Sequence, residues 1–114
     1  MIHDVELREL QVNADDRGSL TEVWRSDWAF YEGEDEPAMS YVSVTYPGVV
    51  RAWHRHVRGQ IDHFVVPDGR VKVAVYDDRE GSPTRGDLDT YVIGEGNMQL
   101  LGVPGDCWHG FEAG

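Results

Sequence analysis

The sequence predicts an all-β fold, an antiparallel jelly-roll barrel, in one domain of 114 residues. Short runs rich in β-branched and aromatic residues recur along the chain at regular spacing, as in sandwiches and barrels. Glycine, proline and aspartate turn signals separate these runs, and the chain has 13 glycines. No segment longer than a single turn has the 3.6-residue periodicity of an amphipathic helix.

Eight segments are expected to form strands. In chain order they are Val5–Leu10, Leu20–Trp24, Ser40–Tyr46, Val49–His56, Asp62–Val66, Val71–Tyr76, Thr90–Ile93 and Met98–Val103. Pro67-Asp68-Gly69 predicts a hairpin turn between two of these strands, because proline and glycine preset the backbone angles of tight turns. Residues 26–31 are expected to form one short helical turn capped by Ser26, and residues 33–37 an exposed loop.

Charge and hydropathy exclude several classes of partner. Asp and Glu number 21 against 10 Lys and Arg, which gives a net charge of −11. A chain this acidic repels nucleic-acid phosphates, so no nucleic-acid partner is expected. No apolar run approaches the roughly 18 residues of a membrane span, and no signal-peptide pattern opens the chain, so we expect a cytoplasmic protein without a membrane partner. The single cysteine, Cys107, allows no internal disulfide.

Three histidines and a glutamine have the spacing of a metal or catalytic site. His54 and His56 are two residues apart in a strand-like segment, which places both side chains on one face. Gln60 follows four residues later, and His109 lies five residues after Pro104. This set resembles the two signature motifs of the cupin superfamily. One interpretation is therefore a divalent transition-metal site, because neutral imidazoles suit zinc, iron, nickel and copper.

Four anchors in the right order resemble the dTDP-4-dehydrorhamnose 3,5-epimerase family, a metal-independent branch of the cupins. They are Asp15-Asp16-Arg17-Gly18 with Glu22, then Gly48–His54, Arg79–Gly86 and Val103–Phe111. The resemblance implies a cupin-type jelly roll that forms a homodimer, acts on a nucleotide sugar and needs no cofactor.

The chemistry that this resemblance implies is proton abstraction beside the ketone of a nucleotide-linked 4-keto-6-deoxy sugar. His54 matches the family's base, a role that suits an imidazole near neutral pH. His109 matches a second family histidine that would stabilise the enolate oxygen. Arg17 and Arg51 match arginines that contact the diphosphate, and Glu22 matches a position near the nucleotide.

The chain also departs from the family pattern. The family's lysine that assists the carbonyl falls near Asp62, which reverses the charge. The family's tyrosine acid and the aspartate that pairs with the base lie beyond Phe111, where three residues follow. We therefore expect a single cupin domain over residues 1–114, truncated at its C-terminus.

A second group of sugar-nucleotide cupins, the 3,4-ketoisomerases, is similar at Arg51, His54, His56 and Gln60. Two histidines on one face can move a proton between neighbouring carbons. Three alternatives to the epimerase thus stay open: a ketoisomerase, a metal-dependent cupin that uses His54, His56, Gln60 and His109, and a sugar-binding cupin without activity. In the epimerase itself, His56, Gln60 and His63 are expected to line the substrate pocket.

Overall fold

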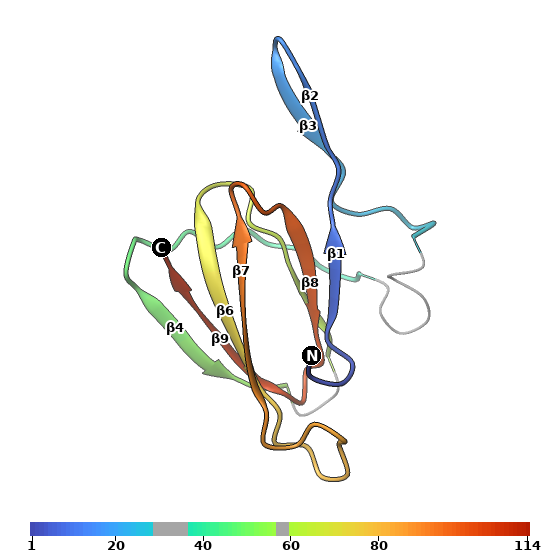
Figure 1. Ribbon diagram of the computed structural model, residues 1–114, viewed down its shortest axis with the longest axis vertical. Helices are drawn as coiled ribbons and strands as arrows, with labels where there is room; N and C mark the ends of the chain where they lie inside the picture. The colour runs from blue at the N-terminus through green and yellow to red at the C-terminus, as the bar shows by residue number, and fades with distance from the viewer. Residues whose placement is uncertain (29–36, 57–59) are drawn as a thin grey trace.

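The computed structural model describes residues 1–28, 37–56 and 60–114, and these residues form nine strands and no helix (Figure 1). The expected all-β fold is therefore confirmed, and no helix in these ranges could span a membrane. The strands are β1 (Glu6–Glu9), β2 (Val12–Asp15), β3 (Gly18–Thr21), β4 (Val50–His54), β5 (Asp62–Phe64), β6 (Arg70–Tyr76), β7 (Leu88–Gly94), β8 (Gln99–Val103) and β9 (Trp108–Ala113).

Two antiparallel sheets enclose the core. One has four strands in the order β4-β9-β6-β7, and the other has three in the order β1-β8-β5. The buried side chains between them come from both sheets, from the N-terminal segment and from the turn between β8 and β9: Ile2, Val5, Val73, Val75, Ile93, Leu101, Val103 and Cys107. Alternation explains this core, because every second residue of β6 points inward.

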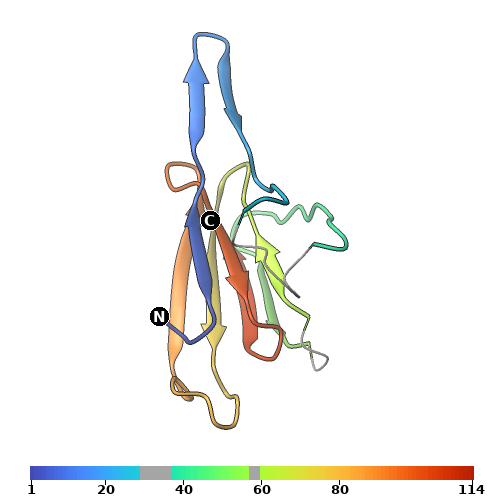
Figure 2. The same ribbon diagram turned by 90° about the vertical axis from the view of Figure 1, so that its right-hand side faces the viewer.

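A third, two-stranded sheet is the hairpin of β2 and β3, which projects from the body of the molecule (Figure 2). Its strands pair from Val12 opposite Thr21 to Asp15 opposite Gly18. Val12 and Leu20 are exposed on it. The hairpin therefore contributes nothing to the core and presents apolar side chains outside it.

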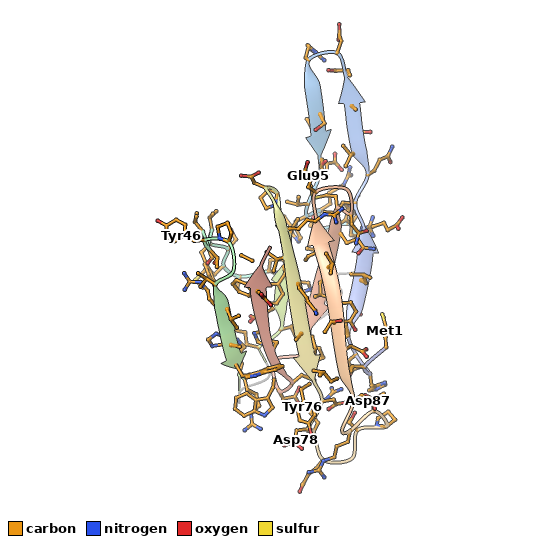
Figure 3. All side chains as sticks on the ribbon, turned by 60° about the vertical axis from the view of Figure 1, so that its left-hand side comes forward. Met1, Tyr46, Tyr76, Asp78, Asp87 and Glu95 are labelled. Atoms are coloured by element: carbon orange, nitrogen blue, oxygen red, sulfur yellow. The ribbon has the colours of Figure 1, made fainter. Side chains whose placement is uncertain are left out.

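A buried aspartate organises the loop between β6 and β7. Asp77 is fully buried and accepts hydrogen bonds from Arg79 Nε (3.0 Å) and Thr84 Oγ1 (2.6 Å), and one from the Ser82 hydroxyl. Arg79 also donates to the His3 carbonyl at 2.7 Å. The Arg79 guanidinium and the two hydroxyls hold the pKa of Asp77 well below its usual range. This loop therefore fixes the N-terminal segment against the end of β6 and β7, where Figure 3 labels Tyr76, Asp78 and Asp87.

Two predicted elements are wrong. Ser40–Tyr46 forms no strand, and Tyr41, Val42 and Val44 are exposed. Its alternating pattern alone does not produce a strand, because a strand requires hydrogen bonds to a neighbouring strand. Residues 37–46 pair with no strand of the described sheets. Pro67-Asp68-Gly69 is a bend and not a hairpin turn, since β5 pairs with β8 whereas β6 pairs with β7 and β9. The bend carries the chain from one sheet to the other.

Other elements differ in extent. The predicted strands include neither β2 nor β9. The predicted strand Leu20–Trp24 overlaps β3, Gly18–Thr21, only at Leu20 and Thr21. The expected helical turn is a hydrogen-bonded turn in which the Trp28 amide donates to the Arg25 carbonyl at 3.2 Å. The rest of that segment and most of the expected loop, residues 29–36, lie outside the described residues.

Candidate active site

Asp62 is the centre of the candidate site. It lies on β5, in the three-stranded sheet, and faces His109 on β9, in the four-stranded sheet. Its Oδ2 atom is 2.8 Å from His56 Nε2 and 3.3 Å from His109 Nε2. Its Oδ1 atom accepts a hydrogen bond of 2.8 Å from Gln60 Nε2. We call His56, Asp62 and His109 the His–Asp cluster; it joins the two sheets at one end of the molecule.

Each member of the cluster is placed by the backbone near it. His109 lies opposite His54 in the register of β4 and β9, and their ring centroids are 6.1 Å apart. His56 follows the end of β4, where its amide donates to the Gly105 carbonyl at 2.6 Å. Phe64, on the same face of β5 as Asp62, packs against the His109 ring, and the two ring centroids are 5.7 Å apart.

Accessibility separates the histidines. The side chain of His109 is 5% exposed and its Nδ1 atom is buried, so His109 presents no nitrogen to an incoming ligand in this structure. The side chain of His56 is 33% exposed, and His54 is exposed on β4. Of the three site histidines, the two that a ligand can reach are therefore His54 and His56.

Asp62 is held in its ionised form. Burial alone would raise the pKa of its carboxyl group, but the interactions with His109, Gln60 and His56 together outweigh burial and lower the pKa well below its usual range. An ionised carboxylate can only accept hydrogen bonds. The histidine nitrogens that face it therefore carry the hydrogen.

His63, the neighbour of Asp62, lies on the other face of β5. Successive strand residues point to opposite sides, and His63 lines a separate hollow with Asp4, Glu6 and Asp106. The structure therefore does not bring His63 to the His–Asp cluster.

Comparisons with known proteins agree with this fold and site. A sequence profile described as dTDP-4-dehydrorhamnose 3,5-epimerase matches residues 1–114. The chain belongs to that epimerase family. It is 70% identical to a Haloferax volcanii protein described as a probable low-salt glycan biosynthesis epimerase, Agl13, over 98% of this chain and 70% of that protein.

Two further members of the comparison are more distant. The Bacillus subtilis spore coat polysaccharide biosynthesis protein SpsL is 38% identical over 98% of this chain and 72% of its own length. The crystal structure of a dTDP sugar isomerase from Desulfovibrio desulfuricans superimposes with a TM-score of 0.75 at 32% identity, over 98% of this chain and 69% of that one. These matches confirm the family resemblance.

The arginine and glutamate positions taken from the epimerase family lie apart from the cluster. Arg17 is in the turn of the projecting hairpin and pairs with Asp15 at 2.6 Å. Glu22 pairs with Arg25 at 3.5 Å. Arg51 is on β4, and its Nε atom donates to Thr45 Oγ1 at 3.0 Å. Of these, only Arg51 shares a strand with a site histidine.

The candidate metal ligands also differ from the sequence-based set. Among the described residues, the ligand atoms of His56, Asp62 and His109 lie within 4.8 Å of one another. Gln60 donates a hydrogen bond to Asp62 Oδ1, whereas both histidines face Asp62 Oδ2. Two imidazoles and one carboxylate form a donor set that suits zinc or iron. The 2.8 Å separation of His56 Nε2 and Asp62 Oδ2 is also that of a direct hydrogen bond.

Asp62 was not among the residues predicted to form the site. In the sequence it stands out only as a reversal of charge at the family's lysine position. Asp62 pairs with His109 on β9 and with His56, which follows β4. These contacts form only where the two sheets meet, so local spacing in the sequence does not reveal them.

Proposed function

We propose that this protein is an epimerase that removes and returns a proton beside the ketone of a nucleotide-linked 4-keto-6-deoxy sugar. The observation that carries the proposal is the contact of His56 and His109 with the ionised Asp62, with the His54 ring beside that of His109, in a member of this family. The naming of one structural relative as a dTDP sugar isomerase supports dTDP as the nucleotide.

His54 is the proposed base. A C4 ketone acidifies the C–H bonds at C3 and C5, because the electron pair left behind spreads onto the ketone oxygen as an enolate. Neutral His54 accepts the proton and becomes an imidazolium, a role suited to an imidazole near neutral pH. Return of a proton to the opposite face of the carbon inverts the centre. The exposure of His54 on β4 supports this role.

The reaction is proposed to need no metal. The direct hydrogen bond between His56 and Asp62 supports this, because it satisfies the nitrogen and the oxygen that a metal would require. Arg51, three residues before His54, is the proposed contact of the substrate diphosphate.

A homodimer is the proposed assembly. Its support is the hairpin of β2 and β3, which leaves Val12 and Leu20 exposed beyond the body of the molecule. A second copy that covers this hairpin would bring Arg17 and Glu22 to a neighbouring site. Light scattering coupled to size exclusion tests the assembly, and a monomer at micromolar concentration would contradict it.

The test of function is proton NMR of dTDP-4-keto-6-deoxyglucose incubated with the protein and a chelator in heavy water. Deuterium at C3 or C5 together with an inverted product is the expected result. Transfer of the ketone to C3 would favour the ketoisomerase instead, an alternative that the nearness of His54 and His56 supports. Absence of exchange with the chelator, restored by a divalent metal, would contradict metal independence.

A further inference from the structure

We propose that Thr45 is a positioning residue that holds Arg51 for the substrate diphosphate. This inference rests on the proposed function, in which Arg51 contacts the diphosphate, and deepens it, because no motif in the sequence assigns a role to Thr45. Three features of the structure support it. A β-bulge brings Arg51 to the face of His54, a tight turn places Thr45 beside Arg51, and the two side chains share a hydrogen bond.

Arg51 and His54 lie on the same face of β4 because the strand contains a bulge. Residues three apart on a regular strand point to opposite faces. In β4, however, Arg51 pairs with Phe111 of β9, and the next pair is His54 with His109, so three steps along β4 match two along β9. Phe111 packs against the core, and directly opposite residues share a face, so both side chains of β4 face inward. Two residues of strand span about 7 Å, which separates the proposed diphosphate contact from the proposed base.

A tight turn places Thr45 beside Arg51. The Val49 amide donates to the Tyr46 carbonyl at 3.1 Å, which closes a four-residue turn directly after Thr45. The third residue of the turn, Gly48, has a φ of 80°, as a type II turn requires. Its amide also donates to a carbonyl at the end of β9 at 2.8 Å and so fixes the turn to the four-stranded sheet. Thr45 is therefore held across the turn from Arg51.

The contact orients Arg51 without offsetting its charge. The Thr45 hydroxyl oxygen accepts a hydrogen bond of 3.0 Å from Arg51 Nε, which leaves both terminal nitrogens of the guanidinium for another acceptor. Arg51 is exposed. Among the described residues no carboxylate pairs with it, whereas Arg17 and Arg79 each pair with an aspartate. In a chain of net charge −11, a neutral partner therefore keeps this cation available for bidentate contact with a phosphate.

Binding of dTDP, measured by calorimetry, tests this role without requiring turnover. Thr45→Val removes the hydroxyl and keeps the shape, and we expect the dissociation constant to rise about three- to tenfold, whereas Thr45→Ser should stay within about twofold of the wild type. Thr45→Asp should bind more weakly than Thr45→Val, because its carboxylate would pair with Arg51 and repel the diphosphate. Thr90→Val, at an exposed threonine on β7, is the matched control and should bind as the wild type.

A double-mutant cycle shows whether Thr45 acts through Arg51. Arg51→Gln should weaken dTDP binding about tenfold or more. Adding Thr45→Val to Arg51→Gln should then change the dissociation constant by less than about twofold. With dTDP-4-keto-6-deoxyglucose as substrate, Thr45→Val should raise KM and leave kcat unchanged, as loss of uniform binding does. A merely structural role would instead lower kcat through a smaller folded fraction and leave KM unchanged.

The outcomes that would overturn the proposal are distinct. Binding of dTDP by Thr45→Val as tightly as by Thr90→Val would do so, as would equal effects of Thr45→Val in the presence and absence of the Arg51 side chain. Wild-type affinity in Thr45→Asp would refute the need for a neutral partner. Failure of the wild type to bind dTDP would remove the diphosphate contact and this role of Thr45 together. A wild type that binds dTDP but leaves the ketosugar unchanged would overturn the proposed function alone, and the cycle would still decide the role of Thr45.

Discussion

At the scale of single residues, the site is defined by which histidines have a carboxylate partner. His56 and His109 both face Asp62 Oδ2, whereas His54 lies exposed on β4. An imidazole beside an ionised carboxylate is held in one orientation, and an exposed one can move to its substrate. The structure therefore combines one free base with one oriented histidine, and the two are separable by mutation.

Replacement of His54 by glutamine is expected to abolish proton removal. Deuterium incorporation into dTDP-4-keto-6-deoxyglucose should fall by a factor of about 100 or more, because general-base catalysis contributes that much. The thermal midpoint should change by less than about 2 °C, since exposed substitutions rarely alter stability by more than ~0.5 kcal/mol. Exchange in His54→Gln at the rate of His3→Gln, the matched control at another exposed histidine, would show that His54 is not the base.

The same scale shows what could be predicted from the sequence. His54, His56 and His109 were predicted from spacing because two-residue alternation and a motif near the C-terminus are local patterns. Asp62 was not, because its histidine partners lie on or directly after strands of the opposite sheet. His63 was expected in the pocket, yet a strand residue next to Asp62 must point the other way.

At the scale of elements, β6 and β9 build the sheet that carries His109. β6 was predicted because Val71, Val73 and Val75 alternate with more exposed residues. β9 was not, because Gly110 and Glu112 break its apolar pattern. Its strand character comes from hydrogen bonding on both sides, to β4 and β6, and such pairing between distant segments leaves little trace in a local pattern.

Gly110 is expected to be required for the packing of β9 on β4. A Cβ atom there would overlap Ala52 Cβ and lie 2.9 Å from Ala52 Cα and 3.0 Å from the Arg51 carbonyl oxygen. These are mostly backbone atoms that cannot move away alone. Gly110→Ala should therefore lower the free energy of unfolding by about 1–3 kcal/mol, measured by urea denaturation. Gly114→Ala is the control, since its Cβ atom would meet nothing closer than 3.7 Å; equal stabilities of the two variants would refute the contact argument.

Asp77 is expected to stabilise the loop between β6 and β7 and to give the protein an acid-sensitive stability. Asp77→Asn breaks a buried pair with Arg79 and should cost about 3 kcal/mol. The folded-state pKa of Asp77 is lowered, so its contribution is complete above the unfolded-state value of about 3.9 and is lost as pH falls below that value.

Chemical denaturation at several pH values between about 2.5 and 6 checks this pH dependence. The free energy of unfolding of the wild type should fall with decreasing pH, and that of Asp77→Asn should fall less steeply. Asp62 has a lowered pKa as well and remains in both proteins, so the difference between the two slopes isolates Asp77. Parallel slopes would mean that the Asp77 carboxyl titrates alike in the folded and unfolded states.

At the scale of the whole molecule, the body and the projecting hairpin differ in whether the described chain buries their apolar side chains. The body was predicted as an all-β fold from its short β-branched and aromatic runs, and the structure shows that its strands bury a common core. The hairpin and residues 39–46 keep apolar side chains exposed, among them Leu20, Met39 and Tyr41. Composition and alternation show that such segments suit a strand, but they do not show whether the chain itself supplies the surface that covers them.

Net charge is the last property that acts on the whole molecule. A charge of −11 on 114 residues repels itself, and this repulsion favours the unfolded chain, in which the charges are farther apart. Salt shortens the Debye length from about 10 Å at 0.1 M to about 3 Å at 1 M and should weaken the repulsion. We therefore expect the thermal midpoint to rise between 0.05 and 2 M KCl, by roughly 5 °C for each kcal/mol of relieved repulsion. Calorimetric scans at constant pH measure the rise, and scans in sucrose control for solvent exclusion; a midpoint that is unchanged or lower in KCl would show that self-repulsion does not limit the stability of this fold.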